Sequence, residues 1–286
     1  MRPLPFIVLL PLVLAAGESP VPLAPGAVVE RLGDGFRFTE GATVLPDGSV
    51  LFTDIPASRI LHWQPQGPIA VWREDSGGAN GLFVRDGVLF ACEGDRRRVT
   101  RTDPDGTVTV LAEGCGGKRF NSPNDLWVDA RGGLYVTDPR YGDRSGMEQD
   151  GEHVYYIAPD GQVTPVATDL VRPNGIVGTT DGGTLYVADH GAGVVWSYRI
   201  ASDGSLADKR RFADVASDGM CLDERGNVYL TSDAVHVHAA DGRRLGTIAV
   251  PVLPTNVCFG EADRRRLFIS GGNALHAVRM GVRGVE

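Results

Sequence analysis

Six polar residues recur at regular intervals along the chain, and their side chains could together bind a cation. They are, in chain order, Glu40, Asn80, Asn124, Asn174, Asp218 and Asn256, and they follow one another at intervals of 38 to 50 residues. Glu40 and Asp218 supply carboxylates, and Asn124 and Asn174 supply amide carbonyls. Such an all-oxygen set with two negative charges is what a hard divalent cation takes, Ca²⁺ above all, with Mg²⁺, Mn²⁺ and Zn²⁺ as alternatives. Softer metals would require His or Cys ligands.

Any one of these six residues, which we call the anchors, has a simpler interpretation. A single Asn or Asp before a strand often caps the turn by bonding its side chain to the backbone. Six polar side chains at equivalent positions, two of them acidic, favour a shared site instead.

Each anchor is followed by the same sequence pattern: a short apolar strand, a Gly turn and a second apolar strand. The clearest copy spans residues 121–138 and ends in Asp138. The period is typical of four-stranded propeller blades, and short apolar runs that end at Gly or Asp-Gly turns favour strands over helices. We therefore predict an all-β, six-bladed β-propeller with four antiparallel strands per blade. The innermost strands of a propeller begin at one face, so the anchors should form a ring there.

The two ends of the repeat region predict how the ring closes. The last repeat, residues 256–280, has room for three strands only, and residues 28–38 contain a strand without a blade. The N-terminal strand should complete the final blade, because this removes the open sheet edges. Residues 28–286 would then form one propeller domain, preceded by a Pro-rich spacer over residues 18–27.

Residues 1–17 have the features of a secretory signal peptide. A basic Arg2 is followed by an apolar run and by the small residues Ala15, Ala16 and Gly17. The run is too short and too often broken by Pro to be a membrane-spanning helix. We expect a periplasmic or secreted protein with no stable membrane anchor after the signal is removed.

Charge and cysteine content narrow the possible partners and cross-links. A net charge of −8 argues against nucleic-acid or anionic-membrane binding, which needs clustered Lys and Arg. The four cysteines are an even number, and export would permit disulfides. However, Cys221 and Cys258 fall in predicted innermost strands, which favours buried thiols that pack as small apolar groups.

Two loops are expected to overhang the mouth of the channel. The longest repeat, that of Asn124, has additional residues 139–150 after its second strand, and the loop after a second strand returns to the face of the anchors. Tyr141 in this loop and His190 in the equivalent loop of the next blade should face the mouth. Loops on a rigid scaffold are where binding residues concentrate.

The motifs in order make the sequence recognisable. They are Glu40-Gly41, Asn121-Ser122-Pro123-Asn124-Asp125, Thr137-Asp138-Pro139-Arg140-Tyr141-Gly142, Pro173-Asn174-Gly175, Ser217-Asp218-Gly219 and Thr255-Asn256. Over residues 40–280 the chain resembles the gluconolactonase family, which also contains regucalcin and the luciferin-regenerating enzymes. The resemblance implies one divalent ion bound by Glu40, Asn174 and Asp218, with Asn124 as a ligand or substrate contact. Where regucalcin-like members have Arg, this chain has Ser122, as in many bacterial lactonases.

These observations predict a divalent-metal-dependent hydrolase that opens the ester ring of a sugar lactone. The cation would polarise the carbonyl and activate water, and Asp218 or Asp125 would accept the proton of that water. Asn124, Ser122, Tyr141 and His190 are the expected substrate contacts. The alternatives are an organophosphate or aryl-ester hydrolase on the same metal site, and a propeller that binds a ligand without catalysis.

Overall fold

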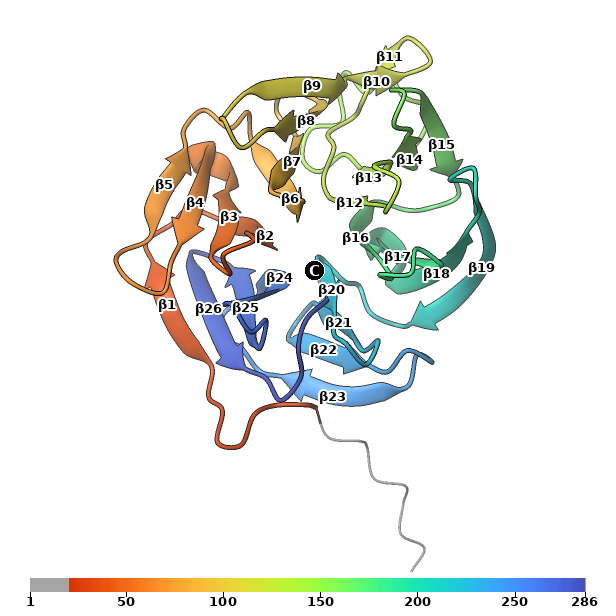
Figure 1. The fold of residues 1–286 in the computed structure, drawn as a ribbon. Helices are drawn as coiled ribbons and strands as arrows, with labels where there is room; N and C mark the ends of the chain where they lie inside the picture. The colour runs from red at the N-terminus through yellow and green to blue at the C-terminus, as the bar shows by residue number, and fades with distance from the viewer. Residues whose placement is uncertain (1–20, 286) are drawn as a thin grey trace, which may run out of the picture.

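The structure, a computed structural model, describes residues 21–285. The predicted signal peptide and residues 18–20 of the spacer lie outside this range. The described residues form six four-stranded antiparallel sheets around a central axis, as Figure 1 shows. The predicted all-β, six-bladed propeller is confirmed.

The blades follow one another in chain order, and the first strand of each of the first five lies nearest the axis (Figure 1). Blade one contains β2 (Thr39–Val44), β3 (Val50–Asp54), β4 (Arg59–Trp63) and β5 (Ala70–Arg73). Blade two contains β6 (Ala79–Arg85), β7 (Val88–Glu93), β8 (Arg98–Thr102) and β9 (Val108–Ala112). Blade three contains β12 (Leu126–Val128), β13 (Leu134–Asp138), β14 (His153–Ile157) and β15 (Val163–Ala167).

The remaining blades repeat the pattern. Blade four contains β16 (Pro173–Gly178), β17 (Thr184–Asp189), β18 (Val194–Ile200) and β19 (Leu206–Ala213). Blade five contains β20 (Met220–Leu222), β21 (Val228–Thr231), β22 (Val235–His238) and β23 (Arg244–Ile248). Blade six contains β24 (Pro254–Gly260), β25 (Arg266–Gly271), β26 (Ala274–Arg279) and β1 (Glu30–Asp34).

The N-terminal strand closes the ring as predicted. β1 pairs antiparallel with β26, with Glu30 opposite Ala277 and Asp34 opposite Ala274. The described part of the spacer continues along the same blade, because Leu23 forms an isolated β-bridge with Met280. Strands from the two ends of the chain therefore belong to one sheet.

A few elements lie outside the blades. A two-stranded hairpin, β10 (Gly114–Cys115) with β11 (Lys118–Arg119), connects blades two and three. Two 3₁₀ turns, η1 (Ile55–Ala57) and η2 (His190–Ala192), follow β3 and β17. No helix in the described range is long and apolar enough to cross a membrane.

The core lies between neighbouring blades. The inner strands β2, β3 and β13 are buried along their whole length, whereas the outer strand β5 is largely exposed. At the contact of blades three and four, Trp127 packs so closely on Gly178 that a Cβ there would lie 2.4 Å from the indole ring. Cys221 and Cys258 are buried in β20 and β24, as expected. This packing fixes where the inner strands begin.

Candidate functional site

Five of the six anchors meet in one pocket at the N-terminal ends of the innermost strands. The pocket has a volume of about 440 Å³. Its lining includes Glu40, Asn80, Asn124, Asn174 and Asp218. The predicted ring of anchors therefore exists for these five residues.

The sixth anchor, Asn256, does not line this pocket. Its Oδ1 accepts the backbone N–H of Val257 at 2.7 Å, and its side chain hydrogen-bonds to Glu40. Asn256 thus supports one of the carboxyls of the ring from outside the pocket.

Backbone contacts between blades hold the anchors in place. The N–H of Gly81 donates to the carbonyl of Asn124 at 2.7 Å, and the N–H of Gly175 donates to the carbonyl of Asp218 at 2.8 Å. A Cβ on Gly175 would lie 2.1 Å from that same carbonyl oxygen. The Gly that follows the anchor is therefore required because neighbouring backbones touch here.

The two carboxyl groups of the ring are close enough to interact directly. Glu40 is buried, and burial raises its pKa well above the usual range, with the nearby charge of Asp218 adding to the effect. Asp218 is half-buried, and loss of solvent raises its pKa as well. Hydrogen bonds from Asn174 and Glu40 partly offset this rise. Two neighbouring carboxyls that both have raised pKa values form a site where a cation can take the place of a proton.

The donor set fits a hard divalent cation. Carboxylate and amide side chains line one pocket, and no Lys or Arg lines it to neutralise the two acids. Within residues 21–285, no group of three or more His, Cys, Asp or Glu side chains is placed to hold a metal ion. The ring does not form such a group because amides complete its set of oxygens.

Asp125, a predicted catalytic residue, is buried but is not among the residues that line the pocket. Its Oδ1 accepts the N–H of Leu126 at 2.9 Å, and the carboxylate also binds the backbone of Ile176 in blade four. Burial raises its pKa to about 7. The carboxylate occupies the space where Gly81 has no side chain, 2.3 Å from the position of a Cβ. Asp125 therefore acts on the ring through charge and packing.

Ser122 and Tyr141, two predicted substrate contacts, line the pocket. Asp138 accepts the backbone N–H of Ser122 at 2.7 Å and thereby fixes the turn before Asn124. The hydroxyl of Tyr141 accepts a hydrogen bond from Asn174 Nδ2 at 2.8 Å. The loop after β13 thus reaches over the mouth of the channel, as predicted.

His190 packs against Tyr141 and is not among the residues that line the pocket. Its ring centroid is 6.3 Å from that of Tyr141 in an edge-to-face arrangement, and its Nδ1 hydrogen-bonds to the carbonyl of Ser217 at 3.2 Å. The charge of His190 also lowers the pKa of Asp218. In this structure the imidazole is a neighbour of the ring, and Tyr141 stands nearer the pocket.

Several pocket residues were not predicted from the sequence. Phe38, Ile55 and Pro56 add apolar side chains to the lining, and Asp95 adds a carboxylate. Ile55, Pro56 and Asp95 lie in loops after the second strand of a blade, as Tyr141 and His190 do. The rule that placed the latter two at the mouth would have found them as well.

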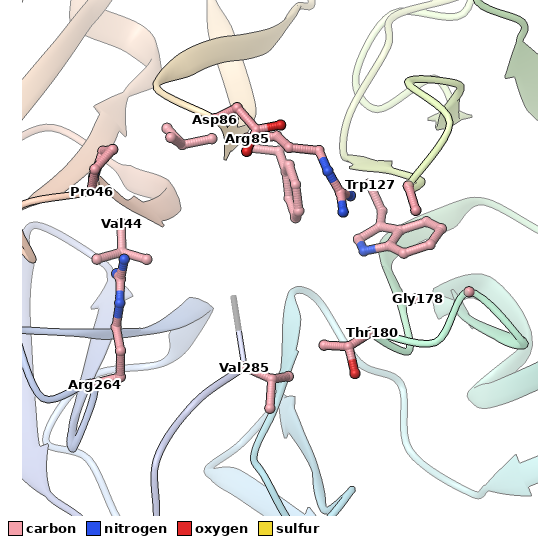
Figure 2. Close-up of a pocket in the computed structure, with 13 residues that line it drawn as sticks. Val44, Pro46, Arg85, Asp86, Trp127, Gly178, Thr180, Arg264 and Val285 are labelled. Atoms are coloured by element: carbon pink, nitrogen blue, oxygen red, sulfur yellow. The ribbon is translucent and has the colours of Figure 1, made fainter.

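A second pocket, of about 370 Å³, lies at the opposite end of the channel, where the innermost strands end (Figure 2). Its lining includes Arg85, Trp127, Arg264 and Val285, and none of the anchors. The C-terminal segment approaches this end, since the N–H of Gly284 donates to the carbonyl of Arg264 at 2.8 Å. The ring of anchors therefore opens to solvent at the other face.

Comparison with known proteins gives consistent matches. Residues 38–273 match the family model described as the SMP-30/gluconolactonase/LRE-like region. A gluconolactonase of Zymomonas mobilis is 30% identical over 291 residues, covering 88% of this chain and 81% of the relative. A pentonolactonase of Haloferax volcanii is 29% identical, covering 82% and 81%. The solved structure of a gluconolactonase of Xanthomonas campestris superposes with a TM-score of 0.83 at 32% identity, covering 91% of each chain.

Proposed function

Since the chain belongs to the SMP-30/gluconolactonase/LRE-like family, we propose that it is a hydrolase that opens the ester ring of a sugar lactone and depends on a divalent cation. The observation that carries the proposal is the pair of adjacent carboxyls, Glu40 and Asp218, which line one pocket together with three Asn side chains. Relatives named as gluconolactonase and pentonolactonase support the substrate class.

Glu40, Asn174 and Asp218 would hold the cation, with Asn124 as a fourth ligand or a substrate contact. Ca²⁺ suits this set best because it accepts oxygen ligands in loose geometry. When bound, the cation supplies positive charge that stabilises the charge developing on the ester carbonyl oxygen.

Asp218 is the residue we assign to proton transfer. It lines the pocket, whereas Asp125 does not. It would accept a proton from the water that attacks the carbonyl carbon and return it to the ring oxygen as the ester bond breaks. The product is an open-chain hydroxy acid. Asp125 would affect the ring from outside the pocket, through packing and through its electrostatic effect on Glu40.

The pocket walls would orient the substrate. Ser122 and Asn124 present a hydroxyl and an amide for hydrogen bonds to the lactone, and Tyr141 closes one side. The hydrogen bond between Tyr141 and Asn174 couples the position of this loop to a residue of the ring. His190 would steady Tyr141 from behind.

The experiment that tests the proposal compares three substrates with and without a chelator. We expect glucono-1,5-lactone to be hydrolysed faster than an aliphatic lactone or a fluorophosphate. Chelation should abolish the activity, and added Ca²⁺ should restore it. Fastest turnover of the fluorophosphate would indicate an organophosphate hydrolase. Hydrolysis of none of the three would favour a propeller that only binds a ligand, and turnover that survives chelation would contradict the metal dependence.

We also propose that the protein is exported and that the signal peptide is removed. The support is the sequence of residues 1–17, which lie outside the described structure. Mass spectrometry of the protein from the periplasm or medium should find a chain that begins near residues 17–20. An intact Met1 in that material would contradict cleavage.

A further inference from the structure

The loop between β7 and β8 places an acid at the rim of the pocket. Asp95 is exposed and lines the pocket. Its backbone N–H donates to the carbonyl of Gly77 at 3.1 Å, and the N–H of Gly94 donates to the carbonyl of Gly78 at 3.1 Å. Two backbone hydrogen bonds therefore hold this acid at a defined place above the site.

The side chain of Asp95 lies across Gly78, which also lines the pocket. A Cβ on Gly78 would be 2.5 Å from the carboxyl carbon and 2.5 Å from Oδ2 of Asp95. Gly78 also has a φ of +65°, which disfavours other residues. The carboxylate thus rests on bare backbone, and this contact requires glycine.

The three arginines that follow Asp95 are all engaged elsewhere. Arg96 pairs with Asp75 at 2.6 Å, Arg97 with Glu148 at 3.3 Å, and Arg98 with Glu93 at 2.7 Å. Within the described part of the chain, the carboxylate of Asp95 has neither a hydrogen bond nor an ion pair. It is therefore available to a ligand, although three cations adjoin it in sequence.

Asp95 also contributes a charge to the pocket that a bound cation would leave unbalanced. A divalent cation would balance the charges of Glu40 and Asp218, and no Lys or Arg lines the pocket. The remaining charged group of the lining is Asp95. A carboxylate accepts hydrogen bonds from hydroxyl groups and repels other anions.

We propose that Asp95 determines substrate specificity. It accepts hydrogen bonds from the hydroxyls of a neutral, polyhydroxylated lactone and disfavours lactones that carry phosphate or carboxylate groups. This inference rests on the proposed function, because it concerns the same pocket and the same reaction.

The test compares Asp95→Asn with the natural protein on three lactones. These are glucono-1,5-lactone, its 6-phosphate and the unsubstituted δ-valerolactone. For Asp95→Asn, the ratio of kcat/KM for the phosphorylated lactone to that for the neutral sugar lactone should rise about fivefold, the effect of one screened charge. The preference for the sugar lactone over δ-valerolactone should fall by a similar factor, through KM rather than kcat, because the contact is made equally in ground and transition states.

Asp105→Asn is the matched control. Asp105 is exposed in the loop between β8 and β9 of the same blade, at the opposite face from Asp95. Asp105→Asn removes the same charge as Asp95→Asn and should leave both kcat/KM ratios unchanged. A thermal unfolding midpoint for each variant checks that the fold is intact.

The outcomes separate this inference from the proposed function. If the natural protein hydrolyses none of the three lactones, the proposed function fails and the inference fails with it. If it hydrolyses them but Asp95→Asn leaves both ratios unchanged, only the role of Asp95 is overturned. Equal shifts for Asp95→Asn and Asp105→Asn would also overturn it, since they would reflect net charge alone.

Discussion

Asp218 and Asn256 begin the innermost strands of neighbouring blades, but their side chains have different surroundings. Asp218 lines the pocket, whereas Asn256 turns to Val257 and Glu40. Asp218→Asn should weaken Ca²⁺ binding by about a hundredfold or more, because it removes one of two charges that face the cation. Asn256→Ala removes a hydrogen bond to Glu40, which we propose as a cation ligand, and should weaken Ca²⁺ binding by about tenfold at most.

Calorimetric titration with Ca²⁺ measures both effects directly, and lactone turnover should fall in the same order. Equal losses of affinity in the two variants would show that Asp218 has no special place in the ring.

The sequence predicted the positions of the anchors better than their orientations. A fixed period showed that Asn124, Asn174 and Asp218 would meet at one face. It could not show that Asp125 would turn toward the N–H groups of Leu126 and Ile176, or Asn256 toward that of Val257. Those orientations depend on backbone donors of neighbouring residues and blades, which have no sequence signature.

At the level of elements, the Asp at the end of the second strand of a blade accepts hydrogen bonds from the backbone just before the first strand of that blade. Asp54 Oδ1 accepts the N–H groups of Arg37 and Phe38, both at 3.1 Å. Asp138 accepts those of Asn121 and Ser122, both at 2.7 Å. The sequence showed this recurring Asp, and the structure explains its purpose. It fixes the loop that leads into an anchor.

Asp138 should make stability depend on pH. Burial raises its pKa to about 7, although the backbone hydrogen bonds and nearby Arg97 and Arg140 oppose the rise. Because the folded state binds this proton more tightly than the unfolded state, the stabilisation is complete below about pH 4 and is lost as pH rises through 7. Between pH 5 and 8 the loss should be about 3 kcal/mol.

Urea unfolding of chelated protein at several pH values tests this, with Asp138→Asn as the reference. The Asn side chain cannot titrate. The variant should be less stable than the natural protein at every pH tested, because its side-chain NH₂ faces a backbone N–H that Asp138 accepts. The difference in unfolding free energy between the natural protein and the variant should therefore shrink as pH rises. Parallel curves would mean that Asp138 does not titrate in this range.

For the whole molecule, the prediction concerns ring closure. Removing residues 1–34 deletes β1 and leaves β26 as an unpaired edge. The four residue pairs between these strands should together contribute about 3 to 4 kcal/mol to the unfolding free energy. Urea unfolding and size-exclusion chromatography should show a less stable chain that tends to associate through the exposed edge.

Removal of residues 1–20 is the control, because it leaves β1 and its contacts intact. If both truncated proteins unfold at the same urea concentration, closure by β1 contributes nothing measurable.

The fold as a whole was predictable because its period repeats six times and each copy carries the same strand and turn signals. The incomplete last repeat also predicted the role of residues 28–38. The hairpin of Gly114–Cys115 with Lys118–Arg119 was not predicted, since two-residue strands are too short to show a pattern. Phe38 and Asp95 at the pocket were also missed, although Asp95 lies in a loop after a second strand, as Tyr141 and His190 do.

Closure by β1 also constrains the timing of folding during synthesis. Glu30 is made long before its partner Ala277. The sixth blade, and with it the closed ring, cannot form until β26 has been made. For the export that we propose, this delay would help to keep the chain unfolded during translocation, because the closed ring could form only after β26 had crossed.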